Sequence, residues 1–244
     1  MGAKSVKHKK APPKKKKINI GKILLVFITT CISLCLILYP YISNYLFENR
    51  ADGIVSAVEA QSESAEDNQY DDDIEAAKAY NENLVTGKIK LKDPFDENAE
   101  DEDTKEYKSL LNMTEDGVMG FIKIPSIDVS LPIYHGTSEE TLEKGAGHLQ
   151  GTSLPIGGPS THTVITGHTG LSSAKLFTDL DELEEGDVFL LHVYDQVLTY
   201  EIDQIRIVQP EDYGFLEIEE GEDLCTLLTC TPYGINTQRL GAWP

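Results

Sequence analysis

The chain has little positive charge after its first 22 residues. Nine of its 21 basic residues lie in those 22 positions, and no acidic residue lies among them. The remaining sequence therefore carries 12 basic and 41 acidic residues, a balance of −29. A basic tail can bind nucleic acid, but this tail adjoins an apolar run, so we predict a membrane-associated role and no nucleic-acid partner.

Motifs that bind phosphate or calcium are absent. The sequence contains no G-x-G-x-x-G pattern, no P-loop and no internal repeat. The acidic run DENAEDEDTKEY invites comparison with an EF-hand loop, but it lacks the glycine at position 6 and the glutamate at position 12 that such a loop needs. We therefore expect no metal ion and no cofactor, and we interpret the acidic runs as solvated surface.

No charged residue lies between Lys22 and Glu48. A helix needs about 20 apolar residues to cross a bilayer core, and this run is long enough. A cleaved signal peptide has a shorter apolar stretch and a small-residue cleavage site, and a soluble helix is rarely apolar all round. We therefore predict a transmembrane anchor over 18–47. Because lysines precede it, the positive-inside rule puts the tail, 1–17, in the cytoplasm and the rest outside.

The rest of the chain divides into two predicted parts. Residues 48–112 are acidic and are predicted as a mostly helical connector. From 113 to 244, short apolar and β-branched runs are broken by proline and glycine, which is typical of strands. The fold class is therefore all-β or β-rich, a closed or nearly closed barrel with short helices.

Individual elements follow from the same patterns. Helices are predicted in SEETLEKGAG and SSAKLFTDLDELEEGD, the first opened by a serine cap. We predict two strands in VMGFIKIPSIDVSLPIYHG, one in THTVITGH, two in VFLLHVYDQVLTYEIDQIRIVQ and one in DLCTLLTC.

Only four cysteines are present. Cys31 and Cys35 lie in the apolar run, whereas Cys225 and Cys230 lie five residues apart on a predicted strand. Side chains at that spacing point to opposite faces, and the two residues are roughly 16 Å apart at the rise of a strand. A disulfide needs Cα atoms within about 7 Å, so at least one thiol of the outer part is available for chemistry.

Cys230 ends a predicted strand and opens into a loop, a usual place for a reactive group on a rigid support. Taken alone, a cysteine on an apolar strand is more often core packing. A thiol nucleophile also needs a proton partner and a group that stabilises an oxyanion. His168 follows VITG at a strand end, and Arg239 is one of only three arginines. Of the other two, Arg50 and Arg206, we interpret Arg206 as facing solvent.

At this point the residues resemble a known family. TLLTC, followed by Arg239, resembles the TLxTC…R signature of sortases, and VITGHTG resembles the strand and loop that carry the sortase histidine. GFIKIPSIDVSLPIYHGTSEETLEKGAGHLQGTSLPIGG and AKLFTDLDELEEGDVF are similar to the pilus-building class C sortases. The resemblance covers about 80–240, together with the N-terminal anchor.

The resemblance extends to a lid. Asp93, Pro94 and Phe95 read DPF, which resembles the Asp-Pro-aromatic plug over the active site of class C sortases. Asp93 would then pair with Arg239, and Phe95 would cover Cys230. The alternative is an ordinary acidic Asp-Pro turn.

The resemblance implies an eight-stranded barrel and a transpeptidase that acts on surface proteins carrying an LPxTG-like sorting signal. Cys230 would attack the Thr–Gly bond and form a thioacyl intermediate. His168 would protonate the leaving amine and then deprotonate the incoming one. Arg239 would bind the carbonyl oxygen as it becomes anionic, and Thr229 would contribute to substrate binding. In class C the incoming amine is a pilin lysine, so the product is a covalent pilus on a Gram-positive type cell surface.

The sequence after Arg239 departs from the family pattern. Class C sortases continue with a last strand and usually a second transmembrane helix, whereas this sequence continues only with LGAWP. Gly241 and Pro244 are poor strand residues. We therefore expect the last strand to be missing, by truncation or frameshift, and Arg239 to be held less firmly than in intact relatives.

Three alternatives remain open. One is a housekeeping sortase that attaches proteins to the cell wall, although the DPF segment and the long connector argue against it. Another is an inactive, truncated sortase-like barrel that binds sorting signals without turnover. A papain-like protease fits poorly, because such enzymes place the cysteine before the histidine, whereas here His168 precedes Cys230.

Overall fold

The computed structural model describes residues 20–66, 68–86, 95 and 105–244. The chain divides into two compact units, Met1–Tyr39 and Pro40–Pro244. Helix α1 (Ile20–Glu63) contributes to both units and contains Pro40. It continues across residue 47, so the predicted boundary between anchor and connector falls inside one helix.

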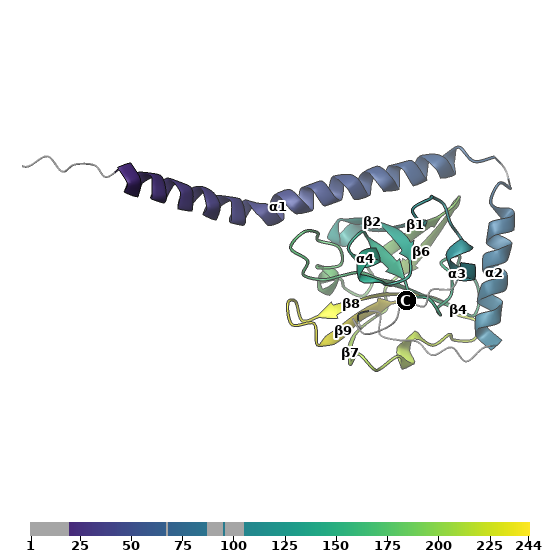
Figure 1. The fold of residues 1–244 in the computed structure, drawn as a ribbon. Helices are drawn as coiled ribbons and strands as arrows, with labels where there is room; N and C mark the ends of the chain where they lie inside the picture. The colour runs from purple at the N-terminus through teal and green to yellow at the C-terminus, as the bar shows by residue number, and fades with distance from the viewer. Residues whose placement is uncertain (1–19, 67, 87–94, 96–104) are drawn as a thin grey trace, which may run out of the picture. The chain divides into compact units, whose positions relative to one another are not determined.

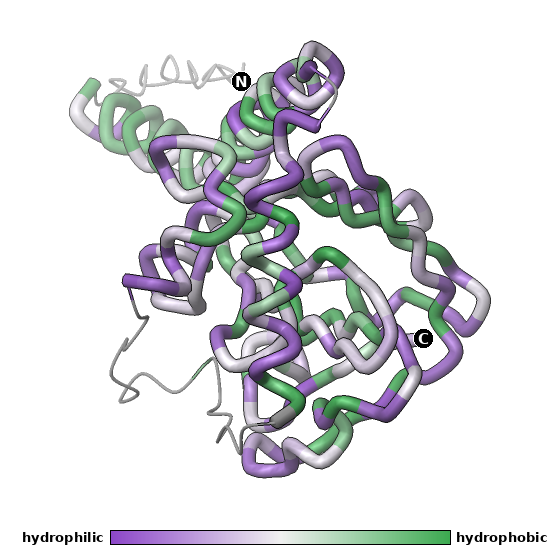
Figure 2. Tube along the Cα trace, turned by 90° about the vertical axis from the view of Figure 1, so that its right-hand side faces the viewer, coloured by the Kyte–Doolittle hydropathy of each residue, from purple (hydrophilic) through white to green (hydrophobic). Residues whose placement is uncertain are grey.

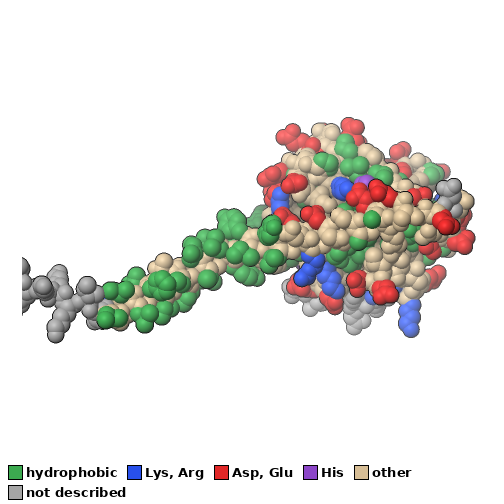
Figure 3. Space-filling view, turned by 90° about the horizontal axis from the view of Figure 1, so that it is seen from above, with side chains coloured by type: hydrophobic (Ala, Val, Ile, Leu, Met, Phe, Trp, Pro, Cys, Tyr) green, Lys and Arg blue, Asp and Glu red, His purple; other side chains and the backbone are tan. Residues whose placement is uncertain are grey.

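The part of α1 before Pro40 is exposed and apolar. Hydrophobic side chains surround it on the face that Figure 3 shows. Within the described residues, α1 is the one helix long and apolar enough to cross a membrane. The structure therefore agrees with the predicted anchor in length and composition.

The second unit is built on a nine-stranded sheet, shown in Figure 1. The strand order is β6-β5-β1-β2-β3-β4-β8-β9-β7. Strands β2 and β3 pair in parallel, as do β4 and β8, and the other pairs are antiparallel. The β-rich class is thereby confirmed. The strands are β1 (Val118–Ile124), β2 (Val129–His135), β3 (Ala146–His148), β4 (Thr161–Thr166), β5 (Val188–Val193), β6 (Gln196–Glu201), β7 (Gln204–Val208), β8 (Asp223–Thr231) and β9 (Gln238–Trp243).

The segment from β5 to β7 contains three strands where two were predicted. Tyr194, at φ 53°, lies in the tight turn between β5 and β6. After β6 the chain turns again at Ile202 and Asp203, and β7 pairs with β9 instead of β6. Alternation of apolar residues located the strands, but it could not reveal the second turn.

Two further helices precede β1, and one short helix and three 3₁₀ turns lie between the strands. They are α2 (Asp71–Thr86), α3 (Lys105–Ser109), α4 (Glu139–Leu142) and the 3₁₀ turns η1 (Pro125–Ile127), η2 (Leu180–Glu182) and η3 (Gly214–Leu216). The serine-capped helix predicted in SEETLEKGAG is confirmed as α4. The helix predicted in SSAKLFTDLDELEEGD does not form, so this prediction is wrong. Only the 3₁₀ turn η2 is present there. Leu176 adopts φ 45°, a left-handed value that a right-handed helix does not accept.

Helix α2, which is part of the second unit, buries one of its faces. Ile74, Ala77, Asn81 and Leu84 are its buried residues, and they recur at the spacing of one helix face. Figure 2, viewed from the side of α2, shows hydrophobic and hydrophilic positions interleaved along it. Ile74 and Ala77 belong to an apolar cluster that includes Phe121 of β1, so the connector is packed onto the sheet.

The last strand, which the sequence led us to expect missing, is present. Strand β9 pairs with β8 on one side and with β7 on the other. Gly241 suits this position because a Cβ atom there would lie 2.9 Å from Phe215 and 3.1 Å from the Trp243 ring. A residue that is poor in strands by propensity is thus used where two aromatic rings approach the backbone.

Candidate active site

The register of the sheet brings His168 and Cys230 to the same level. Strands β4 and β8 run in parallel, with Thr166 opposite Leu228. The pairing continues beyond β4, because the Gly167 amide donates to the Leu228 carbonyl at 3.1 Å. Continued by two residues from Thr166 and Leu228, this register puts His168 at the level of Cys230 on the adjacent strand, and neighbouring strands lie about 4.8 Å apart.

Arg239 enters the same site from the other side of β8. It is the direct antiparallel partner of Cys230 in the β8–β9 ladder. Cys230 and Arg239 are each 7% exposed, and the His168 side chain is 16% exposed. Three residues that lie far apart in the sequence are therefore brought together at one end of three adjacent strands, β4, β8 and β9.

The two thiols of the sheet occupy different environments. Cys230 lies at the end of β8, whereas Cys225 is fully buried inside the barrel core. Burial raises the pKa of the Cys225 thiol well above its usual value, and the nearby Asp223 carboxylate adds to this rise. A thiol with a raised pKa is a poor nucleophile, so Cys225 has a packing role. As predicted, the structure joins neither Cys225 nor Cys230 in a disulfide.

Arg239 is held by its own hairpin. Its Nη1 atom donates to the carbonyls of Asn236 and Gln238, at 3.2 and 3.0 Å. The expectation that Arg239 is held less firmly than in intact relatives rested on a missing last strand, whereas β9 is present with neighbours on both sides. A planar, permanently charged group in this fixed position suits the recognition of an anionic oxygen.

Phe95, the aromatic residue of the DPF segment, lies over this site. Its ring centroid is 5.9 Å from that of His168, and the Arg239 guanidinium carbon lies 5.2 Å from the same ring centre. Phe95 also packs against an apolar cluster of Leu149, Val164, Leu216 and Leu228. Asp93 and Pro94 lie outside the described residues, so the predicted pair between Asp93 and Arg239 stays a prediction.

Thr229 connects the cysteine strand to the histidine loop. Its side chain is buried, and its hydroxyl donates to the Gly167 carbonyl at 2.6 Å. Gly167 itself is tightly enclosed, since a Cβ atom there would lie 2.8 Å from the Phe177 ring. The substrate-binding role of Thr229 stays a prediction, while its observed bond fixes the residue that precedes His168.

Three other histidines of the barrel have structural environments. His148 is fully buried, with Nε2 2.9 Å from the Ser153 carbonyl and Nδ1 2.7 Å from the Tyr107 hydroxyl. Burial lowers the pKa of His148 to about 4, so this imidazole is neutral near pH 7. Burial also lowers the pKa of His135 and of His162, which bond to backbone carbonyls.

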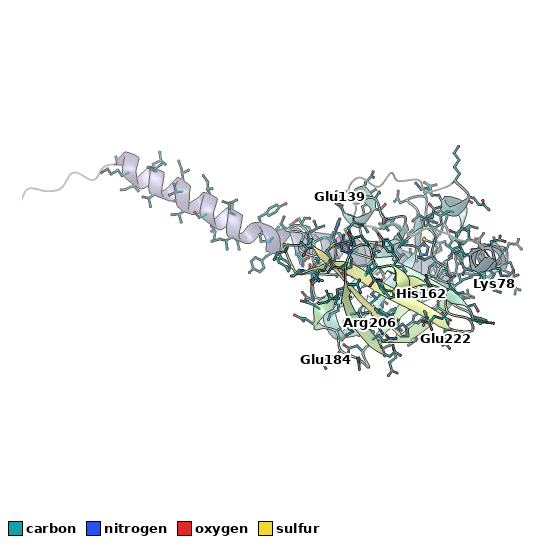
Figure 4. All side chains as sticks on the ribbon, turned by 90° about the horizontal axis from the view of Figure 1, so that it is seen from below. Lys78, Glu139, His162, Glu184, Arg206 and Glu222 are labelled. Atoms are coloured by element: carbon teal, nitrogen blue, oxygen red, sulfur yellow. The ribbon has the colours of Figure 1, made fainter. Side chains whose placement is uncertain are left out.

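Arg206 does not belong to the site. It is exposed on β7, as predicted, and its guanidinium lies 5.4 Å from the centre of the Trp243 ring. Figure 4 shows Arg206 well apart from Glu139. Glu139 lies at the candidate site, because its carboxylate approaches His168.

Glu139 is the residue near the site that the sequence did not reveal. Its Oε2 atom lies 3.3 Å from the His168 Nε2 atom. The sequence indicated a capped helix with acidic residues in its first turn. It held no signal that this turn would meet a loop almost 30 residues further along the chain.

Comparison with known proteins agrees with this arrangement. A family model described as the sortase domain matches residues 122–243. Sortase C of Streptococcus pneumoniae, solved for insights into catalysis and pilin substrate specificity, is 41% identical with a TM-score of 0.70, over 78% of this chain and 94% of that chain. Sortase C-1 of Actinomyces oris is 49% identical with a TM-score of 0.66, over 72% of this chain and 97% of that chain.

A curated relative matches a shorter region. Sortase D of Bacillus subtilis (strain 168) is 32% identical over 114 residues, which is 47% of this chain and 54% of that protein. The chain thus spans about half the length of this relative. Since the family model covers half of the chain and the solved structures match nearly their whole length, this chain belongs to the sortase family, and its solved neighbours are class C sortases.

Proposed function

We propose that this chain is a membrane-anchored cysteine transpeptidase that cuts an LPxTG-like sorting signal between threonine and glycine and transfers the product to a pilin lysine. The observation that carries the proposal is the meeting of Cys230, His168 and Arg239 at the ends of three neighbouring strands. The pilin assignment rests on the similarity to the pneumococcal sortase C.

The first half-reaction uses all three side chains. The Cys230 thiolate attacks the threonine carbonyl carbon and forms a carbon–sulfur bond, while the Arg239 guanidinium stabilises the oxyanion. The carbon–nitrogen bond to glycine then breaks. The His168 imidazolium gives its proton to the leaving amine, so the threonine remains bound to Cys230 as a thioester.

The second half-reaction reverses the proton transfer. The lysine amine attacks the thioester carbon, and neutral His168 accepts the proton that the amine loses. The carbon–sulfur bond breaks and releases the Cys230 thiolate, while an isopeptide bond joins two pilin subunits. Arg239 again faces the oxyanion, because it is fixed by its backbone contacts.

The anchor gives this chemistry its location. Helix α1 is long and apolar enough to cross a bilayer, and lysines precede it in the sequence. We therefore propose a single-pass protein with its basic tail in the cytoplasm and its barrel outside the membrane, where secreted substrates with sorting signals emerge.

The DPF segment supplies a resting-state lid. The Phe95 ring contacts both His168 and Arg239, which are two of the three groups that the reaction needs. A sorting signal and this ring would compete for the same space. We propose that Asp93 pairs with Arg239 when the lid is closed, and that the lid opens before the substrate enters.

The proposal is tested by trapping the intermediate. The full-length chain in detergent micelles is incubated with an LPxTG peptide, and mass spectrometry is used to search for the peptide acyl group on Cys230. A Cys225→Ala control should give the same adduct, and Cys230→Ala should give none. Bound peptide without an adduct, even in a Phe95→Ala variant, would overturn the transpeptidase and favour a protein that only binds sorting signals.

A further inference from the structure

Glu139 is held in place by the start of helix α4. The Ser138 hydroxyl accepts a hydrogen bond from the Thr141 amide at 3.2 Å and caps the helix. The helix is pinned to the barrel by Leu142, which is 1% exposed. Glu139 is the first residue after the cap, so its backbone is fixed while its side chain reaches towards His168.

The contact with His168 is not an ordinary hydrogen bond, and it is an ion pair only when the imidazole is protonated. The Glu139 Oε2 atom lies 3.3 Å from the His168 Nε2 atom. That nitrogen is buried and has no hydrogen-bond partner within the part of the chain that the structure describes. A carboxylate that faces an imidazole nitrogen favours an N–H at that nitrogen and the cationic form of the ring, whereas burial acts against the charged form.

Two other groups of the described chain bear on the charge of His168. The Arg239 guanidinium lies near the same Phe95 ring as His168 does, and a nearby cation disfavours a second one. Cys230 lies on the adjacent strand β8, and the thiolate of the proposed mechanism favours the imidazolium. Glu139 is the carboxylate that the described residues place against the imidazole, so its negative charge offsets the positive charge of Arg239.

We propose that Glu139 is a positioning residue that stabilises the protonated form of His168 for proton donation to the leaving amine. The inference rests on the proposed function, because the proton has a recipient only when a peptide bond is cut. Glu139 remains a carboxylate throughout. It forms no bond to the substrate, and the proton that is transferred comes from the His168 ring.

Exposure limits the size of the effect. The Glu139 side chain is 69% exposed, so water and salt screen its charge. We expect removal of the charge to slow acylation by up to about fivefold, which corresponds to the strength of exposed ion pairs. The loss should shrink as ionic strength rises.

The chain offers a matched control in the next residue. Glu140 lies in the same first turn of α4, and its carboxylate is 2.6 Å from the Lys144 ammonium. Glu139→Gln and Glu140→Gln each remove one negative charge from the helix start, so they change the interaction with the helix dipole equally. Only the first removes the group that faces His168.

Two measurements on the full-length chain in detergent micelles test the proposal. The first follows the ring NMR signals of His168, assigned with a His168→Gln variant, between pH 4 and 10. We expect Glu139→Gln to lose its protonated-ring signal at lower pH than the wild type does, while Glu140→Gln follows the wild type. The second is the pH dependence of acylation by an LPxTG peptide, whose alkaline limb should move to lower pH in Glu139→Gln only.

The outcomes separate this inference from the proposed function. If Glu139→Gln and the wild type share one NMR titration, the inference is overturned whether or not the peptide reacts. If the NMR titration moves but no variant is acylated, the contact stands and the transpeptidase proposal fails. If Glu140→Gln moves the titration as much as Glu139→Gln does, the effect is general charge and the specific role of Glu139 is refuted.

Discussion

Cys230 and Arg239 are direct partners across the antiparallel strands β8 and β9. One hairpin therefore presents the thiol and the guanidinium together, and each is 7% exposed. His168 comes to the same place through the parallel pairing of β4 with β8. Cys230 and Arg239 lie on paired strands, and His168 lies just beyond β4, where Gly167 is tied to β8 by a hydrogen bond. Such fixed positions suit the oxyanion stabilisation that we propose for this site.

The first prediction concerns the lid. Replacing Phe95 with alanine removes the ring that touches His168 and Arg239, so iodoacetamide should label Cys230 several times faster. Asp93→Ala should act in the same direction. Peptide mapping distinguishes Cys230 from the fully buried Cys225, which should stay unlabelled in every variant. Labelling of Cys230 at the wild-type rate would argue against a plug.

The second prediction concerns Arg239. Lysine keeps the charge but not the planar fork that donates to the carbonyls of Asn236 and Gln238. Arg239→Lys should therefore lower kcat for transpeptidation about 10²- to 10³-fold, as expected when an oxyanion contact is lost. Arg206→Lys, on the exposed edge strand β7, is the control and should keep wild-type kinetics. Equal rates for both variants would remove Arg239 from the mechanism.

The third prediction concerns Thr229. Thr229→Val keeps the shape but deletes the hydroxyl that donates to the Gly167 carbonyl. A buried carbonyl without its donor should lower the free energy of unfolding by about 1–3 kcal/mol, measured by urea denaturation in micelles. Acylation should slow as well, because Gly167 precedes His168. Thr199→Val on the exposed face of β6 serves as the control. Equal free energies of unfolding for Thr229→Val and Thr199→Val would contradict the prediction.

The fourth prediction concerns Gly241. A methyl group there would lie 2.9 Å from Phe215 and 3.1 Å from Trp243, so Gly241→Ala should destabilise the barrel by about 1–3 kcal/mol through overpacking. Gly53→Ala is a useful comparison, since a Cβ atom at Gly53 meets nothing within 4 Å. That change lies within helix α1 and should be neutral or stabilising. Thermal unfolding of the two variants decides the matter.

The fifth prediction concerns pH and His148. Burial lowers the pKa of His148 in the folded chain to about 4, against about 6.5 for an unfolded histidine. Between these values the unfolded chain binds a proton that the folded chain does not, so the free energy of unfolding falls as the pH is lowered from 6.5 to 4. The His148→Gln variant lacks the imidazole that binds this proton in the unfolded chain. Its free energy of unfolding, measured by urea denaturation, should therefore fall less steeply between pH 6.5 and pH 4 than that of the wild type. Parallel plots of this free energy against pH would show that His148 does not contribute.

Much of the molecule followed from local sequence patterns. A charge-free run is sufficient to predict an apolar helix, and alternation with proline and glycine located β1, β2, β4 and β8 with their ends nearly correct. The TLLTC and VITGH motifs pointed to Cys230 and His168 because both residues were predicted at strand ends. In the structure, Cys230 is the residue before the end of β8, and His168 lies just beyond the end of β4. These features depend on residues close together in the chain, so they can be read without the fold.

The other features were decided by contacts between distant segments. Strand β9 forms despite Gly241, because β7 and β8 pair with it on both sides and aromatic rings fill the space that the glycine leaves. The helix predicted before η2 does not form, because this segment instead anchors the His168 loop through the Phe177 amide. Phe95 and Glu139 likewise approach His168 from segments that are distant in the sequence. Sequence alone indicated the residues that we propose for the chemistry, and tertiary structure decided what surrounds them, because burial and charge at a site depend on which distant strands and loops meet there.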